Sequence, residues 1–303
     1  MAENIPFDRR FNAVPGVVEE VAPSVRRVLA PNPGPFTFTG TCSYIVGRGE
    51  VAIIDPGPDD AAHLAAMLDA VRGEKVTHIF LTHTHRDHSG ALAALKAATG
   101  APSYAEGPHR AARPLHEREA ATLDSSGDRS FLPDVALADG ARIEGAGWAL
   151  SALATPGHTA NHMAFVLERE GAVFVGDHVM GWSTTVVAPP DGSMNDYMGS
   201  LRRLGARPET LYLPGHGGAI AQGPAFVERF LRHRQARETA ILRALERGPR
   251  SIPDIVRAIY FGLDPRLAGA AGLSTLAHLE DLVERGDVLT DGPALREGIY
   301  RLP

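Results

Sequence analysis

The chain of 303 residues, 44% hydrophobic and 22% charged, has the composition of a soluble globular protein. Its length favours about two domains. No apolar run approaches the roughly 20 residues of a membrane span, and Met1 to Asp8 lack the basic start and apolar core of a secretory signal. The net charge of −6 argues against a basic nucleic-acid coat, although not against a local basic groove. One cysteine, Cys42, excludes an internal disulfide, so we expect a cytoplasmic protein.

The first part of the chain reads as short strands and helices. Apolar, β-branched runs predict strands over Val25–Leu29, Thr41–Val46, Val51–Asp55 and Val76–Leu81. The turn Asp55-Pro56-Gly57-Pro58 should lead into a helix from about Asp60 to Val71. After the last of these strands, Ser89 is expected to cap a helix from Ala91 to Ala98.

The segment between that strand and that helix holds three histidines and a carboxylate within six residues. They are His83, His85, Asp87 and His88 in the stretch THTHRDHSG. A continuous helix would spread the three rings apart, and in a strand His88 would face away from the other two. Only a loop can bring them together. Because imidazole and carboxylate are ligands that zinc accepts, the stretch predicts half of a metal site.

Three later positions can supply the other half, because each follows a strand-like run. His158 follows Trp148–Ala154, Asp177 follows Ala172–Val175, and His216 follows Thr210–Leu213. Loops at strand ends are where α/β proteins usually place their chemistry. Further strands are expected near Val135, Arg142–Ile143 and Met163–Leu167.

Residues 106–127 lack an apolar period and predict a solvated loop or a lid over the site. Arg110, Arg113 and His116 in this segment could meet an anionic substrate, with simple solvation as the favoured alternative.

After His216 the pattern becomes helical. One helix is expected from Pro224 to Glu246; two more helices and two strand-like pieces, Val288–Thr290 and Gly298–Leu302, then describe a winged helix. We expect a domain that holds the metal site over residues 1–224, a linking helix over 225–249 and a winged-helix-like domain over 250–303.

The arginines of this region lie on the linking helix rather than on the winged helix. Seven arginines stand against three glutamates between Ala225 and Arg250, whereas Ser251–Pro303 has five arginines and eight acidic residues. Acidic residues on the expected recognition helix would repel phosphates. Arg232, Arg234 and Arg237 are therefore the candidate RNA contacts, with a solvated face as the alternative. Two roles stay open for the winged helix. It is structural or forms a dimer contact, or it contacts RNA.

With these positions the chain resembles the metallo-β-lactamase superfamily, whose pattern is H-x-H-x-D-H followed in order by His, Asp and His. The resemblance implies an α/β (α+β) fold, a four-layer αββα sandwich. It also implies that His83, His85 and His158 hold one metal, that Asp87, His88 and His216 hold a second, and that Asp177 bridges them. With the winged helix, the stretches TPGHTANHM, GDHVMG, NDYMGSLRRL and LYLPGHG look like the lactamase-beta-like group, which includes single-strand endoribonucleases and metal-dependent hydrolases.

The implied chemistry is hydrolysis by a hydroxide held between two divalent metals, most readily zinc, with iron or manganese as alternatives. Two such ions about 3.5 to 4 Å apart lower the pKa of a bound water to about 7. Asp87 and Asp177 are the expected catalytic carboxylates. Asp55, His162 and His178 are expected to support or surround the ligands, with closure of a turn as the alternative for Asp55.

More than one substrate fits this chemistry. The sequence favours a phosphodiesterase that cleaves single-stranded RNA, with a thioester hydrolase of glyoxalase II type as the alternative. The missing export signal argues against a β-lactamase, and the intact ligand set argues against a non-catalytic nucleic-acid-binding regulator. Expected partners are a small-molecule or RNA substrate, with no membrane and with a homodimer as an option.

Overall fold

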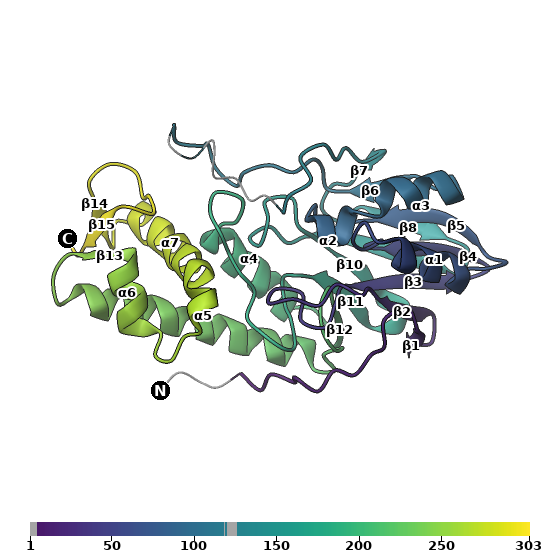
Figure 1. Ribbon diagram of the computed structural model, residues 1–303, viewed down its shortest axis with the longest axis horizontal. Helices are drawn as coiled ribbons and strands as arrows, with labels where there is room; N and C mark the ends of the chain where they lie inside the picture. The colour runs from purple at the N-terminus through teal and green to yellow at the C-terminus, as the bar shows by residue number, and fades with distance from the viewer. Residues whose placement is uncertain (1–4, 118, 120–125) are drawn as a thin grey trace.

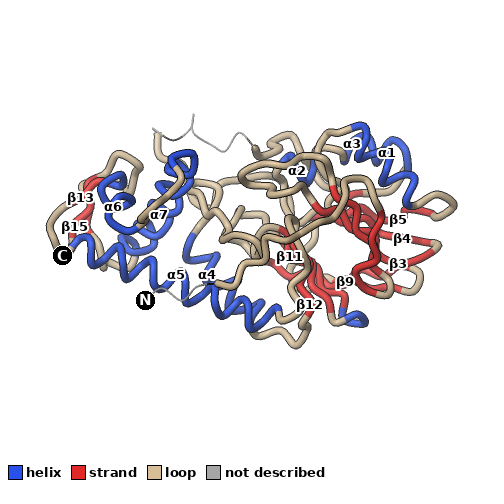
Figure 2. Tube along the Cα trace, turned by 60° about the horizontal axis from the view of Figure 1, so that its bottom comes forward, coloured by secondary structure: helices blue, strands red, loops and turns tan. Residues whose placement is uncertain are grey.

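The architecture is a layered α/β sandwich beside a smaller helical domain (Figure 1). The computed structural model describes residues 5–117, 119 and 126–303. Two sheets pack face to face, helices cover their outer faces, and the C-terminal domain lies at one end of the sandwich (Figure 2). The predicted αββα sandwich with a C-terminal winged helix is confirmed.

The first sheet has seven strands in chain order, antiparallel from β1 to β4 and parallel from β4 to β7. Successive side chains on a strand face opposite ways, so Ile45 and Ile53 pack under the outer helices while Tyr44 and Ile54 face the second sheet. The strands are β1 (Val18–Ala22), β2 (Val25–Leu29), β3 (Cys42–Arg48), β4 (Glu50–Ile54), β5 (Lys75–Phe80), β6 (Ser103–Ala105) and β7 (Val135–Ala136).

The second sheet has five strands in the order β12-β11-β10-β9-β8, and only the β11–β12 pair is parallel. Its central strands are apolar on both faces because one face meets the first sheet and the other meets helices. The strands are β8 (Arg142–Gly145), β9 (Trp148–Ala154), β10 (Met163–Leu167), β11 (Ala172–Gly176) and β12 (Leu211–Pro214).

Helices cover both outer faces of the sandwich. α1 (Ala61–Ala70) and α3 (Leu92–Thr99) pack on the first sheet, while α4 (Met194–Gly205) and α5 (Gly223–Leu245) pack on the second. The side chain of Asp60 accepts a hydrogen bond from the backbone N–H of His63 and so caps α1, and Ser193 caps α4 in the same way. A short 3-10 helix, η1 (Glu168–Glu170), joins β10 to β11.

Several elements differ from the sequence prediction. β1, β6 and α4 were not predicted, because β1 is half exposed and charged and β6 has three residues. The apolar spacing of α4, from Met194 through Tyr197 to Leu201, carries a helical signal that the prediction did not use. Ser89 does not cap α3: its hydroxyl donates to the carbonyl of His85, and Ala91 precedes the helix without a side-chain cap.

The C-terminal domain is a winged helix that shares its core with the end of α5. Ile241 and Leu245 of α5 pack with Ile255, Leu279 and Tyr300, so the domain is anchored on the preceding helix. Its small sheet has the order β13-β15-β14. The elements are β13 (Arg250–Ser251), α6 (Ile252–Ile259), η2 (Pro265–Leu267), α7 (Ala268–Glu284), β14 (Leu289–Thr290) and β15 (Ile299–Arg301).

The long helix α5 exposes only one of the three arginines that the sequence proposed as RNA contacts, so the expectation of a solvated face holds for Arg232 and is wrong for Arg234. Arg234 is 3% exposed, donates to the carbonyl of Thr185 and lies over the ring of Tyr197. Arg237 is half-buried and donates to the carbonyl of Ile259 at 2.9 Å. Arg232 is exposed and pairs with a glutamate one turn away. The reason is position: α5 packs on both domains, which buries its inner arginines.

No helix in the described part of the chain is both long enough and apolar enough to cross a bilayer.

Candidate metal centre

The predicted ligand segment begins where β5 ends and runs into a one-turn helix, α2 (Arg86–Ser89). His83 and His85 lie in the expected loop, but Asp87 and His88 lie within α2, where the sequence predicted a loop. A helix of four residues is too short to show an apolar period, which is why the pattern missed it. The single turn brings His88 back against the ring of His83, with ring centroids 4.2 Å apart.

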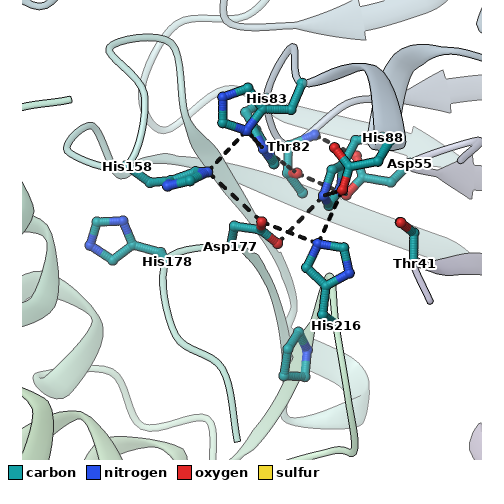
Figure 3. A network of polar contacts seen from close by, with 12 residues as sticks. Thr41, Asp55, Thr82, His83, His88, His158, Asp177, His178 and His216 are labelled. Carbon is teal, nitrogen blue, oxygen red and sulfur yellow. Dashed lines mark hydrogen bonds and ion pairs between the residues drawn. The ribbon is translucent and has the colours of Figure 1, made fainter. Parts of the chain in front are cut away.

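Three histidine nitrogens converge at one point of the site. Nδ1 of His85 lies 3.0 Å from Nε2 of His83 and 3.1 Å from Nε2 of His158. His83 and His85 follow β5, while His158 follows β9, so two neighbouring loops from the two sheets meet here. Figure 3 shows His83 and His158 pointing toward each other.

A second group converges beside the first. Nε2 of His216 lies 3.2 Å from a carboxylate oxygen of Asp87, and Nε2 of His88 lies 3.6 Å from the same oxygen. Asp177 stands between the two groups: its Oδ1 is 3.4 Å from His88, and its Oδ2 is 3.3 Å from His216 and 3.8 Å from His158 (Figure 3). The structure therefore brings all seven predicted ligands together, with Asp177 in the bridging position.

This donor set fits two divalent cations. Nε2 of His88 and Oδ1 of Asp177 are buried and make no hydrogen bond within the described residues, and buried polar atoms without a partner are rare unless an ion or water satisfies them. Nδ1 of His85 meets one nitrogen of His83 and one nitrogen of His158, and a single ring nitrogen cannot form a hydrogen bond with both. Imidazole and carboxylate donors in this combination suit zinc, iron or manganese.

The histidines and carboxylates of the site shift one another's pKa values. Burial would lower the pKa of His88, but neighbouring carboxylates, first Asp87 and Asp177, raise it well above its usual value. For the same reason the pKa of His216 rises to about 9. Burial would raise the pKa of Asp177, yet the two histidines beside it lower that pKa well below the usual value. A metal entering this half of the site therefore competes with protons.

Asp55 supports the ligand segment from behind, as the sequence prediction proposed. Its Oδ1 accepts a hydrogen bond from the backbone N–H of Thr82 at 2.8 Å. Its Oδ2 accepts from the Thr82 hydroxyl at 2.8 Å and lies 2.9 Å from Nδ1 of His88. Because Asp55 occupies Nδ1 of His88, Nε2 is left to face the metal position.

His162 and His178 behave differently from each other. His162 accepts a hydrogen bond from the backbone N–H of Asp177 at 3.2 Å and so helps to hold the bridging carboxylate. His178 is turned away from the ligands (Figure 3), and its Nε2 lies 3.3 Å from the carbonyl of Tyr197. Burial lowers the pKa of His178 to about 3, so this ring is neutral and serves the packing of α4.

One polar network beside the site was not predicted. His109 pairs with Asp191 at 3.1 Å, with both side chains almost fully buried. Nδ1 of His109 lies 2.9 Å from the hydroxyl of Thr84, which also accepts a hydrogen bond from Asn161. No short-range pattern links residues so far apart, and only the neighbouring letters of THTHRDHSG and TPGHTANHM hint that Thr84 and Asn161 lie near the ligands.

A cavity of about 840 Å³ opens above the ligands and extends to the winged helix. Its floor includes His85, Asp87, His158, Asp177 and His216. α7 and the segment before β15 form part of its wall, so the cavity is completed by both domains. The apolar residues of the wall are Phe36, Met180, Val186, Ala188, Pro189, Pro190, Ala270, Leu273, Leu276 and Leu295.

The described parts of the predicted lid, residues 106–127, border this cavity through Glu119 and Ser126. Arg113 pairs with Glu119 at 2.7 Å and also with Glu280 of α7, so it ties the segment to the winged helix. Arg110 pairs with Glu106. Residues 118 and 120–125 of the predicted lid lie outside the described residues.

A cluster of histidines and carboxylates that could hold metal ions lies at the strand ends of an αββα sandwich, beside a cavity, which is the arrangement typical of a metal-dependent hydrolase. The chain belongs to the metallo-beta-lactamase superfamily, whose family model matches residues 36–216. A second model, the beta-lactamase associated winged helix domain, matches residues 251–294.

Known proteins of similar sequence and structure include fungal and bacterial relatives. A lactamase-like protein of Aspergillus niger is 31% identical over 84% of this chain and 78% of its own length. A protein of Paecilomyces divaricatus named atrochrysone carboxyl ACP thioesterase is 35% identical over 76% of this chain and 67% of its own. The crystal structure of a metallo-beta-lactamase family protein from Thermus thermophilus matches with a TM-score of 0.75 and 28% identity, over 94% of this chain and 100% of that one.

Proposed function

We propose that this protein hydrolyses thioesters of bulky apolar acyl groups, using two divalent metals that are most readily zinc. The observation that carries the proposal is the cavity, whose floor is the ligand cluster and whose walls are largely apolar. Apart from histidines, Arg296 is the one basic residue among the described residues that line it. An acyl chain gains from apolar walls, whereas a nucleic-acid backbone needs several cations along its path.

The name of the Paecilomyces relative supports this substrate class, since it refers to a thioesterase that acts on an acyl carrier protein. Arg296 is exposed at the edge of the cavity and makes no ion pair within the described residues. It is therefore available for the phosphate of a carrier arm such as phosphopantetheine, while the acyl group occupies the apolar interior.

The residues of the chain have separate tasks in this reaction. When bound, the two metals would polarise the thioester carbonyl and make hydroxide available at neutral pH. His83, His85 and His158 would hold one metal, and Asp87, His88 and His216 the other. Asp55 keeps His88 in the orientation that points Nε2 inward, and His162 restrains Asp177. The apolar walls exclude water from the acyl chain.

The test is hydrolysis of a series of acyl-CoA thioesters from acetyl to decanoyl by the zinc-loaded protein. We expect kcat/KM to rise with chain length, because each added CH₂ group that enters the cavity leaves water and is worth about 0.8 kcal/mol when fully buried. If no thioester in the series is hydrolysed, the proposal is wrong. A flat dependence on chain length would remove the role of the apolar walls.

Cleavage of single-stranded RNA is the second candidate, and one observation favours it. A groove of about 750 Å³ between α5 and α6 is lined by Arg237, Arg243, Arg247 and Arg250, and by no acidic residue among those described. Phe261, 90% exposed, borders the groove. Arginines bind phosphates and an exposed aromatic ring can stack on a base. However, the groove and the cavity share no lining residue.

RNA binding is tested with the exposed pair Arg243 and Arg247 rather than with the buried Arg234. In the double variant Arg243→Gln, Arg247→Gln, the slope of log affinity against log salt should fall by up to about two if both touch phosphates. Arg10→Gln, far from the groove in sequence and exposed, is the control. A parent protein that neither binds nor cleaves single-stranded RNA excludes this candidate.

A further inference from the structure

A buried carboxylate in the cavity wall has one unused oxygen. Asp191 lines the cavity and is only 3% exposed. Its Oδ2 lies 3.1 Å from Nε2 of His109, whereas its Oδ1 has no hydrogen-bond partner within the described part of the chain. A buried acceptor without a donor is unfavourable, so such an atom in the wall of a binding cavity points to a ligand that supplies the donor.

The hydrogen bonds behind Asp191 hold it in this position. His109 takes Oδ2 on one side and contacts the hydroxyl of Thr84 at 2.9 Å on the other. The amide of Asn161 donates to the same hydroxyl at 2.9 Å and to the carbonyl of Gly107 at 3.2 Å. Since Thr84 lies between two metal ligands in the sequence, the network fixes Asp191 relative to the metal centre.

We propose that Asp191 determines substrate specificity by accepting, at Oδ1, a hydrogen bond from a hydroxyl group on the acyl part of the substrate. The inference rests on the proposed thioester hydrolysis and narrows its substrates to hydroxyacyl thioesters with an otherwise apolar chain. The rings of His109 and His85 are 6.4 Å apart, so the hydroxyl belongs near the thioester end of the acyl group.

A neutral hydroxyl fits this position better than an ammonium group. The same wall contains Met180, Val186 and Ala188, among which a cation would lose its hydration. Nε2 of His109 already lies 3.1 Å from Oδ2 of Asp191, so only Oδ1 lacks a hydrogen-bond donor among the described residues. A hydroxyl supplies the missing donor without that desolvation cost.

The experiment compares binding of paired thioether analogues that cannot be hydrolysed. S-decyl-CoA and its derivatives with a hydroxyl on the second, third or fifth carbon are titrated into the zinc-loaded protein by calorimetry. For at least one hydroxyl position we expect binding about tenfold tighter than for S-decyl-CoA, as for a hydrogen bond to a charged group. In Asp191→Ala, which keeps no hydrogen-bonding group at this position, the ratio between the affinities of the hydroxylated analogue and S-decyl-CoA should fall to about one.

Asp59→Ala, at an exposed aspartate outside the cavity, is the matched control and should keep the preference. If the unmodified protein shows no preference for a hydroxyl at any position, or if Asp191→Ala retains the preference, Asp191 is not a specificity residue. The first of these results is measured on the unmodified protein, so the inference can be overturned even if the variant does not fold.

The outcomes also separate this inference from the proposed function. Hydrolysis of decanoyl-CoA without any preference for hydroxyacyl thioesters would overturn the role of Asp191 and leave thioester hydrolysis standing. Preference for the hydroxylated analogues in binding, without hydrolysis of any thioester, would overturn the proposed reaction and retain Asp191 as a ligand-binding residue.

Discussion

The floor and the outer wall of the cavity are built in different ways. The floor consists of ligands that directly follow strands β5, β9, β11 and β12, so short segments of one domain place them. The outer wall comes from α7 and the segment before β15, which reach the cavity because the winged helix packs on the sandwich. The metal ligands are therefore placed by one domain, whereas both domains contribute to the apolar wall of the cavity.

Removing the shared ligand of the floor gives the largest expected effect. Asp177→Ala deletes the carboxylate between the two metal positions, so we expect hydrolysis to fall by at least about a thousandfold and bound metal to drop below two per chain. Metal analysis and kcat are measured together. His178→Gln is the matched control, because that neighbouring ring faces away from the ligands. Full activity in Asp177→Ala would exclude the bridging role.

A change in the outer wall should alter the choice of substrate and leave the floor intact. Leu273→Ala removes apolar surface from the cavity, so kcat/KM for decanoyl-CoA should fall by about tenfold while that for acetyl-CoA stays constant. Leu289→Ala, at an exposed position of the same domain, is the control. Equal losses for both substrates would show that the two parts are not separable.

A smaller effect is expected at the edge of the wall. Arg296→Gln should raise KM for a 4′-phosphopantetheine thioester by about threefold and leave KM for the pantetheine thioester unchanged, because an exposed ion pair contributes little. The two substrates differ only in the phosphate. Arg301→Gln, a surface arginine paired with Asp291, serves as the control. Identical shifts for both substrates would rule out phosphate recognition by Arg296.

Another prediction concerns how stability depends on pH through His63, a buried histidine of α1. Burial lowers the pKa of His63 from 6.5 to about 4, and its Nε2 lies 2.9 Å from the hydroxyl of Ser43. The folded protein therefore prefers the neutral ring: this stability is fully present above about pH 6.5 and is lost as the pH falls toward 4. The loss reaches at most about 3 kcal/mol.

This prediction is checked by denaturant unfolding at pH 7, 5.5 and 4.5. His63→Gln should show a weaker fall in the free energy of unfolding over this range than the unmodified protein. The same slope in both proteins would mean that His63 does not contribute to the pH dependence.

The sequence predicted the floor well because its signals are local. The apolar runs of β9, β10 and β11 mark buried strands, and each later ligand stands just beyond such a run. Spacing within THTHRDHSG indicated a metal site, although it could not show that His85 faces the others with Nδ1 while His83 and His158 use Nε2. Which ring nitrogen faces the other ligands depends on the course of the backbone through β5 and α2.

The wall and the charged surface could not be predicted in the same way. Arg234 has the same helical context as Arg232, and only the packing of α5 against Tyr197 decides which one is buried. The pairing of His109 with Asp191 joins residues that the chain brings together only through its tertiary fold. The sequence ranked RNA first because its motifs and winged helix resemble a group that includes single-strand endoribonucleases and because the linking helix is rich in arginine. Our proposal of an acyl thioester rests instead on the apolar cavity, which the sequence did not reveal.

The most direct test of two-metal thioester hydrolysis is a titration of zinc into the metal-free protein with decanoyl-CoA hydrolysis as the readout. We expect the rate to rise until about two zinc ions per chain are bound and then to stay constant. Hydrolysis that is absent at two bound zinc ions, or that proceeds equally well without metal, would contradict the proposed reaction.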